Sequence, residues 1–175
     1  MPSGSREQDR QYLEAVAEFG PALDRLARGY EADPDLRRDL RQEIHTALWR
    51  SLGKFDGRCS LRTWVYRIAH NAAASQVIRR RSKARFVGLE ELELTSSDDD
   101  PERAAVERDA SQRLLALVQG LTPADRQLTL LYLEDLDAAG IGEITGLSPA
   151  AIAVKIHRIK AVLARRFQEG GDHGR

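Results

Sequence analysis

The stretch from Ser60 to Arg81, SLRTWVYRIAHNAAASQVIRRR, constrains the fold more than any other part of the sequence. Its apolar residues follow steps of four, three and four positions, in the order Leu61, Val65, Ile68 and Ala72. This is the spacing of one face of an α-helix. Ser60 stands in front of the series and is a good N-cap residue. The stretch therefore predicts a long amphipathic helix.

The residues off this stripe are basic, aromatic or amide side chains: Arg62, Trp64, Arg67, His70 and Asn71. The stretch ends in three further cations, Arg79, Arg80 and Arg81. Cations neutralise phosphates, and aromatic faces stack on unpaired bases, so such a helix suits single-stranded nucleic acid. The same residues also fit an amphipathic helix with a solvated basic end. Residue types alone leave both interpretations open.

The charges are unevenly distributed along a chain whose formal net charge is zero. Residues 1–87 hold 17 Lys and Arg against 11 Asp and Glu, and residues 88–111 hold 2 against 9. Residues 112–175 are nearly balanced, with 8 against 7. A basic block, an acidic connector and a near-neutral block indicate interaction surfaces more than catalysis.

Length and composition bound the class of protein. A chain of 175 residues holds one or two small domains. Its single cysteine, Cys59, excludes an internal disulfide and fits a reducing compartment. No apolar run approaches the roughly 20 residues of a membrane span. We therefore expect a cytoplasmic protein without membrane insertion.

Two further helices are predicted before Ser60. Apolar residues between positions 8 and 29 indicate one helix kinked at Pro21, or two short helices. Asp33 and Pro34 then mark the start of a helix that runs to about Leu52. The face opposite its apolar stripe is polar and charged, with Arg38, Asp39, Arg41, Gln42 and Glu43. Three helices of this length can bury a joint core.

The segment that follows is acidic and broken by Pro101. We expect residues 88–105 to form a flexible linker. A solvated tether is the simplest interpretation of its charge, and an acidic tether could also mimic nucleic acid or prevent non-specific binding.

The second informative stretch runs from Leu136 to Phe167. A short helix holding Ile141 and Ile144 is followed by Gly146, which permits a tight turn, and Leu147 is expected to fill the corner. Ser148 and Pro149 then start another helix with an apolar face, Ile152, Ile156, Ile159, Leu163 and Phe167. This is the spacing of a helix-turn-helix, although an ordinary helical hairpin has a similar pattern. The other face of the second helix offers small and basic residues that suit a DNA groove: Ser148, Ala150, Ala151, Ala153, Lys155, Arg158 and Lys160.

Four motifs in the same order resemble those of bacterial sigma factors of the extracytoplasmic-function (ECF) group. The first is Asp39, Leu40, Gln42 and Glu43, which resembles D-L-x-Q-E. The second is Trp64 to Asn71 with the basic end at Arg79 to Arg81, which resembles W-L-Y-R-I-A-R-N. The third, L-x-P-x-x-R, is matched by Leu121, Pro123 and Arg126. The fourth is Glu143, Ile144, Gly146, Leu147 and Ser148, with a looser match from Ile152 to Lys160.

The resemblance implies an all-α fold of two small helical domains on an acidic linker. Residues 8–87 would form a sigma-2 domain for core polymerase and the downstream (−10) promoter element. Residues 106–168 would form a sigma-4 helix-turn-helix domain for the upstream (−35) element, with a tail at 169–175.

The resemblance also assigns residues to partners. Asp39, Gln42 and Glu43 would bind core RNA polymerase. The downstream element would meet Arg62, Trp64, Arg67, Asn71, Arg79, Arg80 and Arg81, although core packing is the favoured role for the Trp64 ring. The upstream element would meet Ser148, Ala150, Ala151, Ala153, Lys155 and Arg158, with Arg126 on a phosphate.

The implied function is recruitment of core polymerase to promoter DNA, with promoter melting and initiation. The family is often restrained by an anti-sigma factor, so a regulatory partner is expected as well. No cofactor, metal or catalytic residue is expected, because the sequence has no P-loop, metal-ligand spacing or nucleophile–base pattern. The alternatives are a stand-alone helix-turn-helix regulator, which would need only residues 136–167, and an enzyme acting on nucleic acid.

Overall fold

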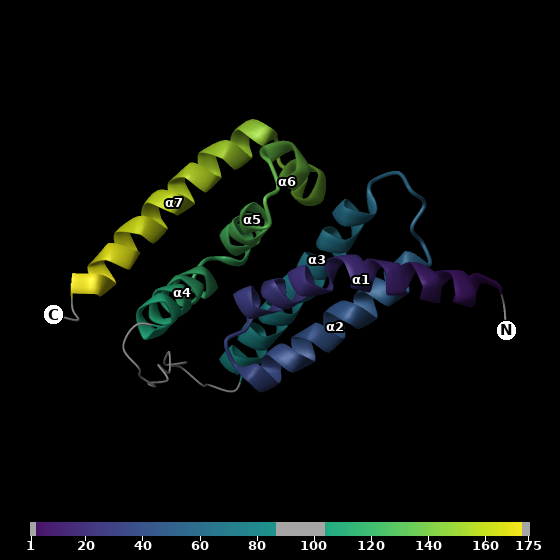
Figure 1. Cartoon of the computed structure of the whole chain (residues 1–175), viewed down its shortest axis with the longest axis horizontal. Coiled ribbons are helices and arrows are strands. Elements are labelled where there is room, and N and C mark those ends of the chain that lie inside the picture. Colours follow the sequence, from purple (N-terminus) through teal and green to yellow (C-terminus); the bar gives the residue numbers. More distant parts are fainter. Residues whose placement is uncertain (1–2, 87–103, 173–175) are drawn as a thin grey trace.

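The described residues form seven α-helices (Figure 1). The computed structural model describes residues 3–86 and 104–172, with side chains for 6–80 and 110–169. The helices are α1 Ser3–Tyr30, α2 Pro34–Leu52, α3 Leu61–Phe86, α4 Ala104–Gln119, α5 Pro123–Leu133, α6 Ala138–Thr145 and α7 Pro149–Asp172. The predicted all-α class is confirmed.

The first three helices pack on one another and form the N-terminal unit (Figure 1). Each contributes a buried stripe, from Phe19, Leu23 and Leu26 through Leu40, Ile44, Leu48 and Leu52 to Val65, Ala69 and Ala73. Each large aliphatic side chain buried here contributes roughly 1.5–3 kcal/mol. Pro21, expected to kink or split the first helix, lies inside the single continuous helix α1.

Local side-chain chemistry sets the starts of two helices. The Asp33 carboxylate accepts hydrogen bonds from the backbone N–H groups of Asp35 and Leu36, both at 2.9 Å, ahead of α2. Thr122 accepts one from Asp125 N–H at 3.3 Å ahead of α5. In each case Pro follows the capping residue, where its missing N–H costs nothing. Both starts agree with the sequence prediction.

The last four helices form the C-terminal unit. Helix α7 packs against α4, α5 and α6, and Figure 1 shows it running the length of the other three. The joint core holds Val118, Leu128, Leu131, Ile141, Ile152, Ile156 and Ile159. Most of the predicted linker, residues 88–105, lies outside the described residues, and its last two positions belong to α4.

The two units pack against each other. Helix α1 contacts α4 and α5, and α3 contacts α5 and α6. The units approach closely at Gly29, where an added Cβ would lie 2.4 Å from a Leu130 methyl carbon. Real Cβ atoms do not approach other atoms so closely, so the absence of a side chain at Gly29 permits this packing.

Candidate nucleic-acid interface

Helices α6 and α7 form a helix-turn-helix. Asp137 caps α6 by accepting a hydrogen bond from Gly140 N–H at 2.8 Å. Gly146 ends α6 at a φ of 77°, in the left-handed region, and its N–H donates to the Gly142 carbonyl. Ser148 then accepts from Ala151 N–H at 3.2 Å ahead of α7. Leu147, predicted to fill the corner, is instead exposed.

The start of α7 shows the predicted DNA-facing residues to solvent. Its apolar stripe turns inward, and four of the five predicted members are buried: Ile152, Ile156, Ile159 and Leu163. Ser148, Ala150, Ala153 and Arg158 are exposed, and Ala151 and Lys155 are half-buried. Val154, between them, is 71% exposed. The structure therefore places the six predicted residues together at the start of α7, on an accessible surface of small and basic side chains.

Two side chains of α5 contact cations of α7. Arg158 lies 3.8 Å from the Asp125 carboxylate. Lys160 donates to the Tyr132 hydroxyl at 3.3 Å, and its ammonium lies 5.1 Å from the centre of that ring. Arg158 keeps a side chain that is 66% exposed, so it remains accessible to an anion.

The buried side of α3 differs by about one position from the predicted stripe. Ser60 caps the helix as expected, by accepting from Thr63 N–H at 3.0 Å. Of the predicted stripe, Val65 is buried and the other three residues are only half-buried. The fully buried line is Val65, Tyr66, Ala69, His70 and Ala73. The prediction that His70 points away from the core is therefore wrong.

His70 belongs to a buried aromatic cluster. Its Nδ1 lies 3.0 Å from the Tyr30 hydroxyl, and its ring is tilted against that of Tyr66 at 6.4 Å. Burial lowers the pKa of His70 to about 3, so its imidazole is neutral near pH 7. Burial, followed by the Glu134 carboxylate, raises the pKa of Tyr66 to about 12. These side chains are buried and hydrogen-bonded within the fold, so they are not accessible to a ligand in this arrangement.

Trp64 packs as the favoured interpretation predicts. Its ring lies against Phe55 with 5.3 Å between ring centres, and its Nε1 donates to Ser51 Oγ at 3.0 Å. The indole therefore joins α3 to the end of α2 and to the loop that connects them. This contact fixes the start of α3, where the predicted DNA-facing arginines begin.

The residues of α3 predicted to bind DNA, other than Trp64, lie in two places. Arg62, Arg67 and Asn71 lie in the first half of the helix, and the first two contact the C-terminal unit. Arg79 lies 3.7 Å from Glu43 on α2, and Arg80 pairs with Glu31. The side chain of Arg81 lies outside the described residues.

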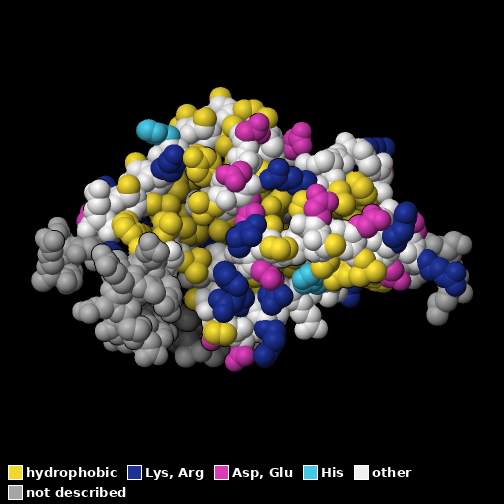
Figure 2. All heavy atoms as spheres, viewed as in Figure 1, with side chains coloured by type: hydrophobic (Ala, Val, Ile, Leu, Met, Phe, Trp, Pro, Cys, Tyr) yellow, Lys and Arg dark blue, Asp and Glu magenta, His cyan; other side chains and the backbone are white. Residues whose placement is uncertain are grey.

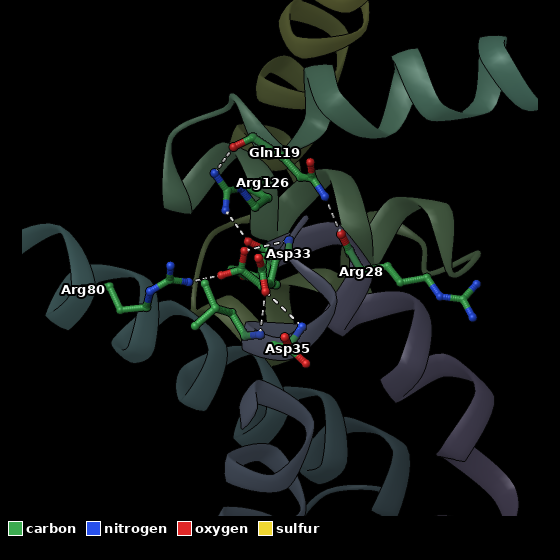
Figure 3. A network of polar contacts seen from close by, with 9 residues as sticks. Arg28, Asp33, Asp35, Arg80, Gln119 and Arg126 are labelled. Atoms are coloured by element: carbon green, nitrogen blue, oxygen red, sulfur yellow. Dashed lines mark hydrogen bonds and ion pairs between the residues drawn. The ribbon is translucent and has the colours of Figure 1, made fainter. Parts of the chain in front are cut away.

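Arg126 does not occupy the exposed position that a phosphate contact requires. It is 2% exposed, and its guanidinium donates to the carbonyls of Gln119, Leu121 and Tyr30. Its charge also lies 5.5 Å from the centre of the Tyr30 ring. Figure 3 shows Arg126 pointing toward Gln119, whose side chain in turn reaches the backbone of Arg28. Arg126 therefore joins the two units from the inside.

The predicted polymerase-binding residues share the outer side of α2. Asp39, Gln42 and Glu43 are all exposed, and Leu40 and Ile44 beside them are buried. Dark-blue side chains gather nearby, over the end of α1 and the start of α2 (Figure 2). A hollow there is lined by Arg28, Arg37, Arg38 and Arg41 together with Asp24 and Asp35.

Sequence reasoning missed the acidic residues that meet α3. Glu134 and Glu143 contact Arg62 and Arg67 across separations of 72 and 76 positions. No spacing rule connects residues so far apart, so only the packing of the two units shows them. Among the described residues, no group of three His, Cys, Asp or Glu side chains gathers as metal ligands would. None of the described helices has the length and apolar character to span a bilayer.

In the comparison with known protein families, each unit matches a different region of the sigma-70 proteins. Residues 15–84 match Sigma-70 region 2, and residues 111–163 match Sigma-70, region 4. The first match falls on the N-terminal unit and the second on the C-terminal unit.

Similar curated proteins cover nearly the whole chain. RNA polymerase sigma-H factor of Pseudomonas aeruginosa is 27% identical over 186 residues, which span 94% of this chain and 96% of that protein. RNA polymerase sigma factor CnrH of Cupriavidus metallidurans is also 27% identical, over 89% of this chain and 85% of its own. ECF RNA polymerase sigma factor SigW of Bacillus subtilis is 24% identical over 75% of each chain.

A solved structure shares the fold. It is a structure of CnrH in complex with the cytosolic domain of CnrY, with a TM-score of 0.66. The likeness covers 95% of this chain and 93% of the other at 23% sequence identity. The arrangement of helices is therefore similar across both units.

Proposed function

This chain belongs to the sigma-70 family and is an RNA polymerase sigma factor, and we propose that its two units hold two separate elements of one promoter. The observation that carries this proposal is the coincidence of the two family matches with the two helical units. In this proposal the core polymerase supplies the catalysis and the chain supplies promoter choice, in the cytoplasm where transcription takes place.

The N-terminal unit, proposed as residues 8–87, would bind the core enzyme through Asp39, Gln42 and Glu43. Their exposure on α2 supports this role, because polar side chains over a buried apolar stripe form a rigid contact surface. Asp39 and Glu43 would pair with cations of the polymerase, which favours a fast and oriented encounter.

The same unit would bind the downstream element through α3. Arg62, Arg67, Asn71, Arg79, Arg80 and Arg81 are the proposed contacts. Arginine forms paired hydrogen bonds to phosphates, and the Asn side chain offers both a donor and an acceptor to a base edge. Trp64 would act indirectly, because its contacts with Phe55 and Ser51 hold the start of α3 in place.

The C-terminal unit, proposed as residues 106–168, would place the start of α7 in the major groove of the upstream element. Ser148, Ala150, Ala151 and Ala153 are small enough to permit a close approach, and Lys155 and Arg158 would meet phosphates or base edges. Arg126 has no part in this proposal, because its guanidinium is held by three carbonyls inside the protein.

A regulatory protein is a further proposed partner. The solved structure of CnrH contains the cytosolic domain of CnrY, which supports a similar complex for this chain. A stand-alone helix-turn-helix regulator would leave the match of residues 15–84 to Sigma-70 region 2 without a role.

Initiation with core polymerase tests the proposed function. Added to core enzyme from its own cell, the chain should start transcripts on genomic fragments that core alone ignores. Asp39→Arg should weaken co-elution with the core enzyme by about tenfold or more, because reversing a charge at an interface costs at least about 1.4 kcal/mol. Glu14→Arg, the same reversal on the exposed side of α1, should leave binding unchanged. Equal binding by the two variants would refute the role of Asp39, and an absence of new transcripts would refute the function.

A further inference from the structure

The apolar side chain of Val154 lies in the middle of the surface that α7 is proposed to place in the major groove. It is 71% exposed, more than any other large apolar side chain of the described residues. Ile152 and Ile156, two positions to either side, are buried in the core, which Val154 does not reach. A contact that covers Val154 would remove apolar surface from water, which is favourable.

The side chains that precede Val154 on this surface offer DNA almost no hydrogen bonds. Ala150, Ala151 and Ala153 have no side-chain donor or acceptor, and the Ser148 hydroxyl already accepts from Ala151 N–H at 3.2 Å as the cap of α7. In a helix-turn-helix, residues near the start of the second helix contact the base edges. In this chain those contacts must therefore be largely apolar.

An apolar contact in the major groove distinguishes thymine from the other bases. Thymine presents its C5 methyl group there, and the other three bases have no such group. The methyl groups of Val154 against a thymine methyl would bury apolar surface on both sides. Against the O6 of guanine or the amino group of cytosine, they would leave a polar group without a partner, which is unfavourable.

Basic side chains beside Val154 favour DNA over a protein as the occupant of this surface. Arg158 follows Val154 by four positions and so lies one helical turn away on the same face, with a side chain that is 66% exposed. Lys155 comes directly after Val154 and is half-buried. An apolar centre with cations at its edge suits a base edge that lies between phosphates.

We propose that Val154 is a specificity-determining residue, which selects thymine in the upstream element through the C5 methyl group of that base. The inference rests on the proposed position of α7 in the major groove. It goes further by naming the base and the chemical group that this chain reads at a place where its side chains form almost no hydrogen bonds.

Replacement of thymine by deoxyuridine tests this inference. Core polymerase loaded with this chain selects a promoter from a randomised library, and the selected duplex is then made with deoxyuridine at each thymine of the upstream element in turn. Deoxyuridine keeps the hydrogen-bonding groups of thymine and lacks only the methyl group. At one or two positions the replacement should weaken binding of the loaded polymerase by about fourfold, which is the effect of one buried methyl group.

Substitutions at Val154 complete a double-mutant cycle with the thymine methyl group. Val154→Ala should bind the thymine promoter more weakly by a similar factor and should bind its deoxyuridine form equally well. Val154→Thr keeps one methyl group and should keep part of the preference for thymine. Leu114→Ala is the matched control, because it removes an exposed apolar side chain of the same unit from α4, and it should leave both affinities unchanged.

Each outcome decides a separate point. An upstream element without thymine, or equal binding of thymine and deoxyuridine at every position, would overturn the inference. Equal sensitivity to deoxyuridine in Val154→Ala and the unmodified chain would also overturn it. Arg158→Ala should weaken binding to the thymine and deoxyuridine promoters alike. If neither Arg158→Ala nor Val154→Ala changes binding, the proposed contact of α7 with the upstream element is itself wrong.

Discussion

The imidazole of His70 is among the most buried polar groups of the N-terminal unit, at 1% exposed. Its Nδ1 is paired with the Tyr30 hydroxyl, and burial lowers its pKa to about 3 from an ordinary value near 6.5. The folded protein therefore keeps His70 neutral at a pH where the unfolded chain would protonate it. This difference makes folding stability depend on pH.

The sign of that dependence gives a prediction for His70. Above about pH 6.5 both states hold a neutral imidazole, and the group adds no pH dependence. As the pH falls from about 6.5 toward 3, only the unfolded state gains the proton, so stability falls by about 1.4 kcal/mol per pH unit. Urea unfolding at pH 6.5 and 4.5 should show a loss of about 2–3 kcal/mol in the original protein that is missing in His70→Gln. Identical losses in the two proteins would contradict the assigned pKa.

Arg126 and Arg158 are both basic residues of the C-terminal unit, but the structure gives them different roles. Arg126→Ala leaves buried carbonyls without a donor, and we expect a loss of about 2–4 kcal/mol of stability. Arg158→Ala should change stability by less than about 0.5 kcal/mol, because that side chain is exposed. Thermal unfolding of the two variants compares them directly. If Arg126→Ala loses as little stability as is expected of Arg158→Ala, the structural role of Arg126 is wrong.

At the scale of the helix, local chemistry made most starts and turns predictable. Asp33 with Pro34, Thr122 with Pro123, and Ser148 with Pro149 each combine a capping side chain with a residue suited to a first turn. These signals act within four residues, so the sequence alone reveals them. The single helix through Pro21 agrees with the first of the two predicted alternatives, one helix rather than two short ones. The exposure of Leu147 depends on surrounding packing and departed from the sequence prediction.

The buried face of α3 shows why periodicity alone places a helix but not its rotation. The predicted stripe and the observed one share Val65, yet the observed face includes Tyr66 and His70. These two side chains are polar at one end, so a hydrophobic pattern counts against them. Their burial is tolerated because Tyr30 of α1 and Glu134, directly after α5, supply their hydrogen-bond partners. Partners of this kind are visible only in the folded molecule.

The turn of the helix-turn-helix gives a prediction at Gly146. Nothing lies within 4 Å of an added Cβ there, so the cost of Gly146→Ala is conformational and we expect about 1–2 kcal/mol. Gly146→Asn should cost less, because Asn tolerates a positive φ. At Gly142 a Cβ would instead lie 2.8 Å from the Leu147 carbonyl oxygen, and Asn should bring no relief. Thermal unfolding of Gly146→Ala, Gly146→Asn, Gly142→Ala and Gly142→Asn separates a conformational cost from a steric one. If Asn and Ala differ in stability by the same amount at both positions, this distinction is wrong.

The whole molecule depends on contacts that join distant parts of the sequence. The predicted two helical units are present, and the proposed site residues of α2 are exposed, as are those of the α7 region except the half-buried Ala151 and Lys155. The seam between the units could not be predicted, because Arg25, Arg62 and Arg67 meet residues that follow them by more than 70 positions. Arg25 pairs with the Glu134 carboxylate, whereas Arg62 and Arg67 donate to the backbone carbonyls of Glu134 and Glu143, and a formal net charge of zero gives no sign of either kind of contact. Shape complementarity at Gly29 and Leu130 is likewise a property of the folded units.

The central claim is that each of the two units reads a different promoter element. Core polymerase loaded with this chain selects active promoters from a randomised DNA library, and sequencing gives the preference at each position. Lys155→Ala with Arg158→Ala on α7 should relax preference only in the upstream element. Arg67→Ala with Asn71→Ala on α3 should relax the base preference only in the downstream element. At each position where a base contact is lost, the preference should fall by about 1–3 kcal/mol. Relaxation of the same positions by both pairs, or of none by either, would contradict the account.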